Sequence, residues 1–358
     1  MTLSYLQASL DKLSCATRED VIEICINPDG SCWGEFHGDH FMRALDQRLT
    51  DTDLRDLGNQ IASSANTTMS RDRPIVSVSI TYRGRPIRAQ VIMPPAVLSG
   101  MSISLRFFSS LPLEQIELRY LYGRERKLEV LRQERNRELR EVVAGGDIYE
   151  AVRFCVEHKL NMIVSGGTST GKTVAARKIL SLVSADERVV TIEEAAELLP
   201  EQPNAVTLIA NRDSAGQSAD TLLAATLRMR PDRIILGEVR GKEAMTFLEA
   251  INTGHGGSMT TLHAETPQLA VQRLAIAALK TDIPMTYQDM VQYIESSIDV
   301  IIQAGREDGQ RGITEFYLPG TDISEEAKHE TLRVPHTKLS AEPESQPCPN
   351  AGPIEPAR

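Results

Sequence analysis

The segment 166–173 (GGTSTGKT) constrains the fold of this chain more than any other feature. It matches the pattern G-x-x-x-x-G-K-[ST], follows the apolar run 160–164 and precedes a helical pattern over 174–183. A glycine-rich loop between a strand and a helix can curl its backbone N–H groups around phosphate, and the helix N-terminus adds partial positive charge. The segment therefore predicts a phosphate-binding loop in a parallel α/β sheet.

The residues around this loop repeat an alternation of short apolar runs and amphipathic patterns. Strands are predicted at 160–164, 189–192, 205–210, 233–236 and 258–262, and helices at 172–183, 217–229, 241–252 and 267–280. Strands that alternate with helices form βαβ units, in which helices cover both faces of the sheet. We expect a mostly parallel α/β domain over 147–320.

The first third of the chain has a different pattern, which predicts a smaller α+β domain over 1–122. Strands are predicted at 21–26, 75–82, 86–93 and 102–107, where apolar and polar residues alternate or apolar residues run together, and helices at 3–13 and 41–64. The sequence Asn27-Pro28-Asp29-Gly30 is a strong turn signal after the first strand.

Two further segments have a composition of their own. Residues 123–146 are dominated by charged side chains of both signs and end in Gly145-Gly146, which predicts a helical or extended connector between the domains. Residues 321–358 are rich in proline and poor in large apolar side chains, which predicts a disordered C-terminal tail.

Composition excludes several classes of protein. With 41% hydrophobic and 25% charged residues, the chain of 358 residues can bury a sizeable core. No apolar run approaches the length of about 18 residues that a membrane span needs. Five cysteines without a CxxC pair suggest neither a disulfide framework nor a zinc site, so a cytoplasmic location is expected.

Charge is unevenly distributed along the chain. The net charge is −10, yet residues 71–140 carry 14 Lys and Arg against 7 Asp and Glu. This basic segment is either a solvated surface or a face toward phosphates, anionic lipid or an acidic partner. In a chain that is acidic overall, sequence-specific binding of nucleic acid is not expected.

The loop 166–173 supplies the first set of candidate site residues. Its Lys172 would reach the β- and γ-phosphates of a nucleotide, and the Thr173 hydroxyl would be a ligand of Mg²⁺. The nucleotide-binding set is Gly166, Gly167, Thr168, Ser169, Thr170, Gly171, Lys172 and Thr173.

Carboxylates follow two of the predicted strands. Glu238 comes after the strand 233–236, and at the carboxyl edge of a parallel sheet it would face the nucleotide and orient or deprotonate the attacking water. Glu193, Glu194 and Glu197 follow the strand 189–192. These three are either a shell for Mg²⁺ and its waters or acidic residues that favour a helix N-terminus.

Histidines flank the last predicted strand of this series. His255 lies in the glycine-rich segment 253–258, and His263 comes directly after the strand 258–262. A histidine in a glycine-rich loop that leads into a sheet strand is a candidate for sensing phosphate, so His255 is included among the catalytic residues.

In this order, the loop at 166–173, the acidic residues at 191–197, the strand and Gly-Glu at 234–238 and the histidines at 254–263 resemble the secretion (traffic) ATPases. These form a hexameric, RecA-like superfamily of P-loop enzymes. The segments VIEICINPDGSCW and ISLRF in the first domain make the chain look most like the ATPase of bacterial type IV secretion and conjugation machines. The resemblance covers about residues 10–320.

The resemblance implies a RecA-like P-loop domain after an amino-terminal domain, a homo-hexameric ring, and hydrolysis of ATP with Mg²⁺. It also implies arginines that reach the phosphates from the amino-terminal domain and from a neighbouring subunit. Arg106 is the first candidate for the role of the amino-terminal domain, followed by Arg119 and Arg124. Arg228 and Arg230 are candidates for contacts with the acidic residues or with another subunit. Glu194-Ala195 stand where relatives often have Asp-Pro, so the metal role is assigned to Glu193.

The function expected from these features is an ATPase that powers type IV secretion, through pilus assembly or transfer of DNA or protein. Its partners would be other components of the apparatus, with peripheral attachment to the cytoplasmic face of the inner membrane. The alternatives are a type IV pilus or type II secretion motor, and a RecA-like hexameric motor that acts on nucleic acid. The latter would need a basic or aromatic loop in the catalytic half, where the net charge is strongly negative.

Overall fold

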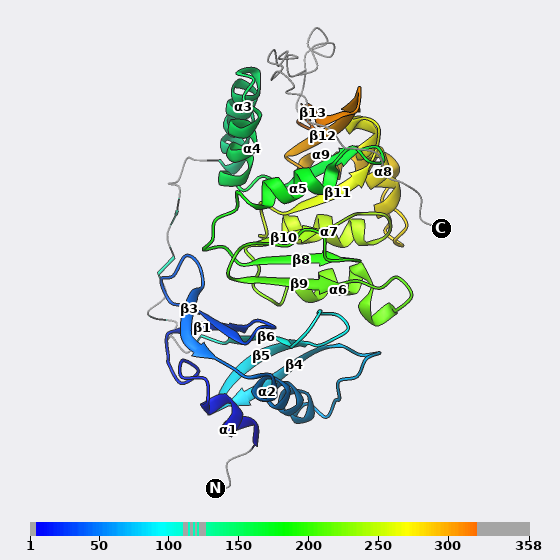
Figure 1. Ribbon diagram of the computed structural model, residues 1–358. Helices are drawn as coiled ribbons and strands as arrows, with labels where there is room; N and C mark the ends of the chain where they lie inside the picture. Colours follow the sequence, from blue (N-terminus) through cyan, green and yellow to red (C-terminus); the bar gives the residue numbers. More distant parts are fainter. Residues whose placement is uncertain (1–4, 110–113, 115–116, 119, 122–126, 321–358) are drawn as a thin grey trace, which may run out of the picture.

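The computed structural model of the chain describes residues 5–109, 114, 117, 118, 120, 121 and 127–320. These residues form one sheet of six strands and one of seven, which lie one above the other in Figure 1. The predicted α/β class is confirmed, because the larger sheet is mostly parallel and has helices on its faces. The predicted tail 321–358 and the connector residues 123–126 lie outside the described residues.

The six-stranded sheet is antiparallel, with strand order β3-β2-β1-β6-β5-β4. Its strands are β1 (Val21–Ile26), β2 (Ser31–Phe36), β3 (Arg43–Arg48), β4 (Ile75–Tyr82), β5 (Arg85–Ile92) and β6 (Ser102–Phe107). Helices α1 (Tyr5–Asp11) and α2 (Asp51–Ser64) lie on one face, where Leu10, Leu54 and Ile61 are buried in one cluster with strand residues. The predicted turn after β1 is confirmed by a Gly30 φ of 85°.

The predicted helix over 41–64 is wrong in its first part. Residues Arg43–Arg48 form edge strand β3, which pairs with β2, and the helix begins only at Asp51. Thr50 and Asp53 form a capping box, in which each side chain accepts a hydrogen bond from the other residue's backbone N–H. That cap fixes the start of α2, while the charged side chains of β3 obscure its alternation and suit an exposed edge.

The seven-stranded sheet has strand order β13-β12-β7-β11-β10-β8-β9, and only β13 is antiparallel to its neighbour. Five strands confirm the predicted ones: β7 (Met162–Gly166), β8 (Val189–Glu193), β9 (Ala205–Ile209), β10 (Arg233–Leu236) and β11 (Met259–His263). Sequence analysis did not predict the hairpin of β12 (Val300–Glu307) and β13 (Gln310–Tyr317) or strand β2.

Helices cover both faces of this sheet, as predicted. On β7, Ile163 points into a core with helices α6 to α9, whereas Met162 and Val164 point into a second core with α3, α4 and α5. The helices are α4 (Ile148–Glu157), α5 (Lys172–Leu180), α6 (Ala219–Thr226), α7 (Glu243–Asn252), α8 (Pro267–Ala278) and α9 (Tyr287–Ser297). Within the described part of the chain, no helix is both long and apolar enough to span a bilayer.

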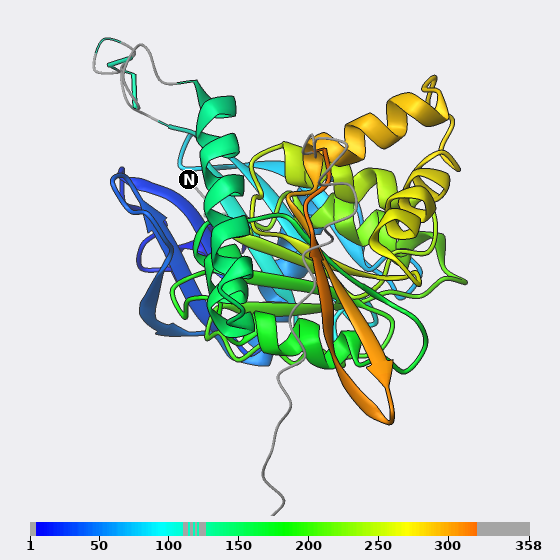
Figure 2. The same cartoon turned by 90° about the horizontal axis from the view of Figure 1, so that it is seen from above.

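The charged connector contains a helix, α3 (Leu128–Ala144), which lies beside the larger sheet in Figure 2. Leu139 and Val143 are buried in the core shared with α4 and α5. Arg132 and Arg135 both form ion pairs with Asp299, at 3.4 and 2.6 Å. The helical alternative of the prediction is therefore the one observed, and α3 packs as part of the larger α/β unit.

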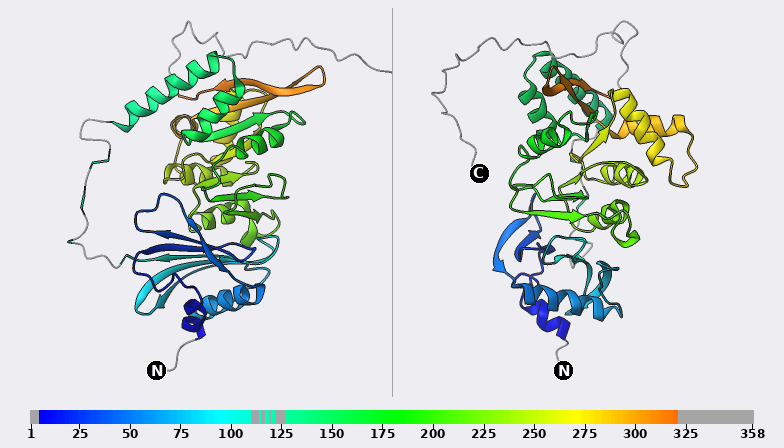
Figure 3. Two further views of the ribbon diagram at one scale, coloured as in Figure 1. Left: turned by 60° about the vertical axis from the view of Figure 1, so that its left-hand side comes forward. Right: turned by 45° about the vertical axis from the view of Figure 1, so that its right-hand side comes forward.

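The two sheets meet where an edge strand of the larger one faces the smaller (Figure 3). Val97 forms a β-bridge with Leu208 of β9, and the Ile209 N–H donates to Ala96 O at 2.8 Å. At the other end of β9, the buried Arg188 donates to the amide oxygens of Asn204 and Asn27, the latter at 2.7 Å. Arg230 donates to Glu35 of β2 at 2.7 Å, so polar contacts connect the two units.

Candidate active site

A cavity of about 1160 Å³ opens at the carboxyl edge of the seven-stranded sheet. Strands β7, β11, β10 and β8 are parallel neighbours there, so the residues that follow them meet at one edge. The residues around the cavity include Ser169, Gly171, Lys172, Thr173, Glu193, Glu194, Gly237, Glu238, Thr261 and His263. The candidate groups from four separate segments are thus brought together.

The glycine-rich loop is held tightly between its neighbours. A Cβ on Gly166 would lie 2.5 Å from Ala304 O and 2.5 Å from the Thr170 hydroxyl oxygen, so only glycine fits there. Gly171 has a φ of 91° and is the N-cap residue of α5. This backbone turns the first N–H groups of α5 toward the cavity, where they would meet a phosphate. Gly167, Thr168 and Thr170 belong to the same loop without lining the cavity.

Lys172 is a nearly buried cation without a carboxylate partner. Its side chain is 8% exposed, and Nζ donates to Gly167 O at 2.6 Å and to His263 Nδ1 at 3.3 Å. Among the described residues no carboxylate lies within ion-pair distance of Nζ. Burial lowers the pKa of this lysine, and the more distant carboxylates of Glu238 and Glu265 oppose that shift. A buried positive charge without a counter-ion fits an anionic ligand such as a phosphate.

Glu238 lies across the cavity from the loop and is connected to Lys172 through His263. His263 Nε2 is 3.4 Å from Glu238 Oε1, and Arg240 binds the other carboxylate oxygen. Burial and the nearby Lys172 charge lower the pKa of His263. A neutral imidazole with its proton on Nε2 satisfies both contacts, since Nδ1 accepts from Lys172 and Nε2–H donates to Glu238.

The acidic residues after β8 have different environments. Glu193 is buried, and its carboxylate accepts hydrogen bonds from the Thr191 hydroxyl at 3.1 Å and from the N–H groups of Glu197 and Leu198, both at 2.9 Å. Glu193 therefore shapes the loop that follows it as well as lining the cavity. Glu194 is exposed and forms an ion pair with Arg212.

Arg106 does not line this cavity. It is exposed on β6, and with Arg85, Arg88, His37 and other residues it surrounds a second cavity of about 400 Å³ in the six-stranded unit. Arg228 is exposed, while Arg230 is bound by Glu35 and Asp232 within the same chain. Arg119 and Arg124 lie outside the described residues.

The prediction for His255 is contradicted by its position. Strand β11 runs from its glycine-rich loop toward the cavity, so the loop lies at the amino edge of the sheet, opposite the site. His255 Nδ1 is 3.1 Å from Ala250 O, and the ring does not line the cavity. The last residue of β11, His263, lies in register with Gly166 and reaches the site instead.

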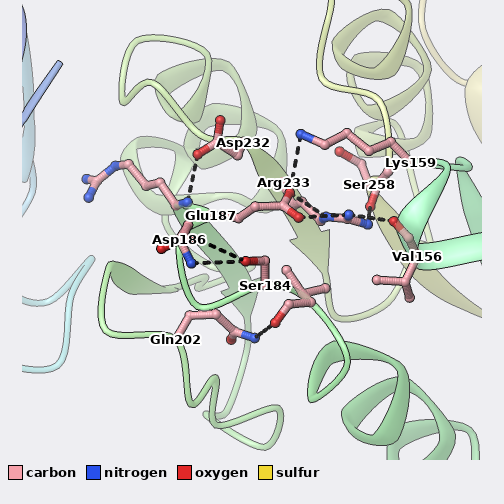
Figure 4. A network of polar contacts seen from close by, with 12 residues as sticks. Val156, Lys159, Ser184, Asp186, Glu187, Gln202, Asp232, Arg233 and Ser258 are labelled. Atoms are coloured by element: carbon pink, nitrogen blue, oxygen red, sulfur yellow. Dashed lines mark hydrogen bonds and ion pairs between the residues drawn. The ribbon is translucent and has the colours of Figure 1, made fainter. Parts of the chain in front are cut away.

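At this amino edge a buried ion pair holds several segments together (Figure 4). Arg233 is 1% exposed and donates to both carboxylate oxygens of Glu187, at 2.8 and 3.0 Å. It also donates to Val156 O at 2.7 Å and to Gly257 O at 3.3 Å. The Arg233 charge is matched by the Glu187 carboxylate, so this pair is structural.

Sequence analysis missed the cations that approach the cavity from other segments. Arg212, Arg240, Lys242 and Arg311 all line it. Arg240 could have been inferred, because it follows Glu238 by two residues and lies beyond the same strand. Arg311 could not, because its hairpin was not predicted.

Comparisons with known proteins agree with this geometry. A family model described as "Type II/IV secretion system protein" matches residues 49–307. The conjugal transfer protein TrbB of Rhizobium radiobacter is 31% identical over 319 residues, which cover 87% of this chain and 88% of that protein. The type IV secretion system protein VirB11 of Bartonella henselae is 30% identical over 289 residues, which cover 75% and 80%.

Among solved structures, the VirB11 ATPase from the Brucella suis type IV secretion system, in complex with sulphate, has the same fold. Its TM-score is 0.78 at 26% sequence identity, over 88% of this chain and 95% of that chain. Because the family model matches well over half of the residues, the chain belongs to the type II/IV secretion system protein family.

Proposed function

We propose that this protein is an ATPase that powers a type IV secretion or conjugation machine. One observation carries the proposal: Lys172 is buried at the glycine-rich loop without a counter-ion, in the cavity that also holds Glu238. That pair of charges fits a nucleoside triphosphate with a water molecule between its γ-phosphate and a carboxylate. The named relatives, a VirB11 ATPase and a conjugal transfer protein, support the biological setting.

Each residue of the site has a role that follows from its position. The N–H groups at the start of α5 and the Lys172 ammonium bind the phosphates and stabilise negative charge that develops on them. Glu238 orients the attacking water and takes its proton, and His263 holds both Glu238 and Lys172 in place. Arg240 binds the second Glu238 oxygen and fixes the orientation of this carboxylate.

The donor set also fits Mg²⁺, which when bound would neutralise negative charge on the phosphates. No group of three His, Cys, Asp or Glu side chains that could hold a metal occurs in the described ranges, so the ion would depend on the nucleotide for ligands. The Thr173 hydroxyl lines the cavity and would bind the ion directly. Glu193 would contact it through water, since both carboxylate oxygens already accept hydrogen bonds.

We further propose a homo-hexamer in which Arg106 serves a neighbouring subunit. Arg106 lies in the six-stranded unit, away from the nucleotide cavity of its own chain. Its role at the phosphates therefore requires a second copy. The proposed division is an amino-terminal domain (1–122), a connector (123–146) whose helix α3 packs on the larger unit, and an ATPase domain (147–320). We also propose a cytoplasmic protein that attaches peripherally to the inner membrane through other components of the apparatus.

The test is ATP hydrolysis by purified protein with Mg²⁺. Lys172→Ala and Glu238→Gln should each reduce the turnover rate at least about a hundredfold, because the first removes the cation that stabilises the phosphate and the second removes the base that takes the proton of the attacking water. Lys178→Ala is the matched control, since this lysine lies on the same helix, is exposed and does not line the cavity. Wild-type turnover in Lys172→Ala would refute the proposal.

A complementation test addresses the setting. In a host whose own gene is deleted, the wild-type chain should restore transfer and Glu238→Gln should not. Restoration by Glu238→Gln would separate transfer from hydrolysis and contradict the proposed motor.

A further inference from the structure

We propose that Arg311 is a nucleotide-binding residue, which holds the phosphate chain of a nucleoside di- or triphosphate from the β12–β13 hairpin, beside the start of helix α5. The proposal rests on the proposed function, because it assigns a further contact to the same cavity. It concerns the β12–β13 hairpin, which projects from the sheet in Figure 2.

The hairpin is fixed beside the glycine-rich loop by its pairing. Strand β12 pairs in parallel with β7, and Ala304 lies opposite Gly166, where β7 ends. The hairpin continues past this point to Asp308 and Gly309, which have φ angles of 48° and 82°. Two left-handed residues at the tip are typical of a tight two-residue β-turn, which keeps the hairpin rigid. The tip therefore overhangs the carboxyl edge of the sheet.

A β-bulge aims the end of the hairpin at the site. The register between β12 and β13 shifts between Gln303 and Ala304, which leaves Thr314 as the extra residue on β13. A bulge increases local twist and redirects the residues beyond it. Beyond this bulge, Arg311 comes next to the loop: a Cβ placed on Gly171 would lie 3.6 Å from Arg311 Cδ and 3.8 Å from Arg311 Cβ.

The charge of Arg311 is not matched by the protein. Arg311 lines the cavity and forms no ion pair with any described residue. Its direct cross-strand partner is Arg306, a second arginine without an ion pair. Like charges directly opposite each other destabilise an antiparallel pair, so the arrangement costs stability in the free protein. An anion at the loop would offset that cost, because Arg311 lines the cavity and Arg306 does not.

A guanidinium at this place suits the phosphate chain. Its planar fork can donate two parallel hydrogen bonds to phosphate oxygens, and the aliphatic part already packs on Gly171. Lys172 comes from the loop and Arg311 from the hairpin, and both line the cavity, so both cations would act on the phosphates. Because ADP and ATP share their α- and β-phosphates, Arg311 should support the binding of both.

The experiment measures ADP affinity by isothermal titration calorimetry on the full chain with Mg²⁺, together with ATP turnover. Arg311→Ala should raise the Kd for ADP at least about tenfold, as expected for loss of hydrogen bonds between charged groups. The KM for ATP should rise in proportion, with kcat within about threefold of wild type, since the contact is shared by the ground and transition states. Arg311→Lys should give an intermediate Kd.

Arg306→Ala is the matched control, because it removes the same charge from the facing strand and relieves the same repulsion without touching the cavity. Its Kd should stay within about twofold of wild type. An Arg311→Ala protein that binds ADP as tightly as Arg306→Ala, or that loses kcat while its ADP affinity is unchanged, overturns the proposal. If the wild-type protein neither binds ADP nor hydrolyses ATP, the proposed function is overturned, and the proposal for Arg311 falls with it.

Discussion

Two buried cations at opposite edges of the seven-stranded sheet, Arg233 and Lys172, have opposite environments. At the amino edge, the Arg233 guanidinium is bonded to both oxygens of Glu187 and to two backbone carbonyls. At the carboxyl edge, the Lys172 ammonium is almost as deeply buried, yet it contacts only a carbonyl oxygen and a neutral histidine. Both cations come from the same fold and similar depth, so burial alone does not distinguish them.

The difference separates a structural role from a binding role. A charge whose partners are all supplied by the protein contributes to the folded state and leaves nothing for a ligand. A charge that lacks its counter-ion costs stability until a ligand supplies one. The comparison therefore predicts that substitutions at the amino edge affect folding, whereas substitutions at the carboxyl edge affect nucleotide binding.

The largest expected effect is on stability, from Arg233→Ala. It leaves the Glu187 carboxylate buried with only Lys159, at 3.4 Å, to balance it. Breaking one half of a buried ion pair costs about 3–5 kcal/mol of unfolding free energy. Urea denaturation, followed by circular dichroism, measures this loss.

Two further variants make the amino-edge prediction specific. Lys159→Ala removes the more exposed partner of the same carboxylate and should cost less than about 1 kcal/mol. The double variant Arg233→Met/Glu187→Leu replaces the whole pair by apolar groups and should recover most of the lost stability. If Arg233→Ala unfolds within about 1 kcal/mol of wild type, the pair is not the structural element inferred from its contacts.

The second-largest expected effect on the free energy of unfolding concerns Glu23, a buried residue that lies at neither edge of the seven-stranded sheet. Glu23 of β1 is 4% exposed at the contact between the two sheets and has no ion pair within the described residues. Burial raises its pKa from 4.5 to about 7, the negative charge of Glu35 adds to this, and Arg106, Arg188 and Arg230 oppose it. In the native state, this carboxyl group therefore releases its proton near neutral pH.

Stability should consequently fall as pH rises through the range between those two pKa values. Between pH 4.5 and about pH 7, the native state binds more protons at Glu23 than the unfolded state does. Above pH 7 the group is ionised in both states, and the native state is destabilised by the full cost of burying that charge. Glu23→Gln should thus stabilise the protein by about 3 kcal/mol at pH 8.5 and by much less at pH 5. Urea denaturation of both proteins at the two pH values gives the difference, and equal gains at both would contradict the shifted titration.

Sequence reasoning located most of the carboxyl edge because its signals are local. The pattern at 166–173 predicts its own strand, loop and helix, and Glu238 and Glu193 each follow an apolar run that was recognised as a strand. Parallel topology then implies that these residues meet. All five strands predicted between 160 and 262 were observed, with boundaries that differ by at most two residues.

The failures came from information that is not local. His255 and His263 flank the same strand, and only the direction of β11 within the sheet decides which of them reaches the site. The ion pair of Arg233 joins residues that are 46 positions apart, so no local pattern reveals it. Strand β3 was mistaken for the start of a helix because its charged residues mask the alternation that an edge strand needs.

The smallest expected effect on stability comes from Lys172→Ala. It is the most informative, because it tests directly whether Lys172 differs from Arg233. The substitution removes a cation that forms no ion pair, which relieves a desolvation cost, and it loses the hydrogen bonds to Gly167 O and His263 Nδ1, worth about 1 kcal/mol each. The unfolding free energy should therefore stay within about 1 kcal/mol of wild type.

ADP should raise the Tm of the wild type but not that of Lys172→Ala, since a ligand stabilises only a protein that binds it. Thermal unfolding with and without ADP measures both quantities. If Lys172→Ala loses as much stability as Arg233→Ala, Lys172 is a structural cation, and its missing counter-ion does not mark a ligand site.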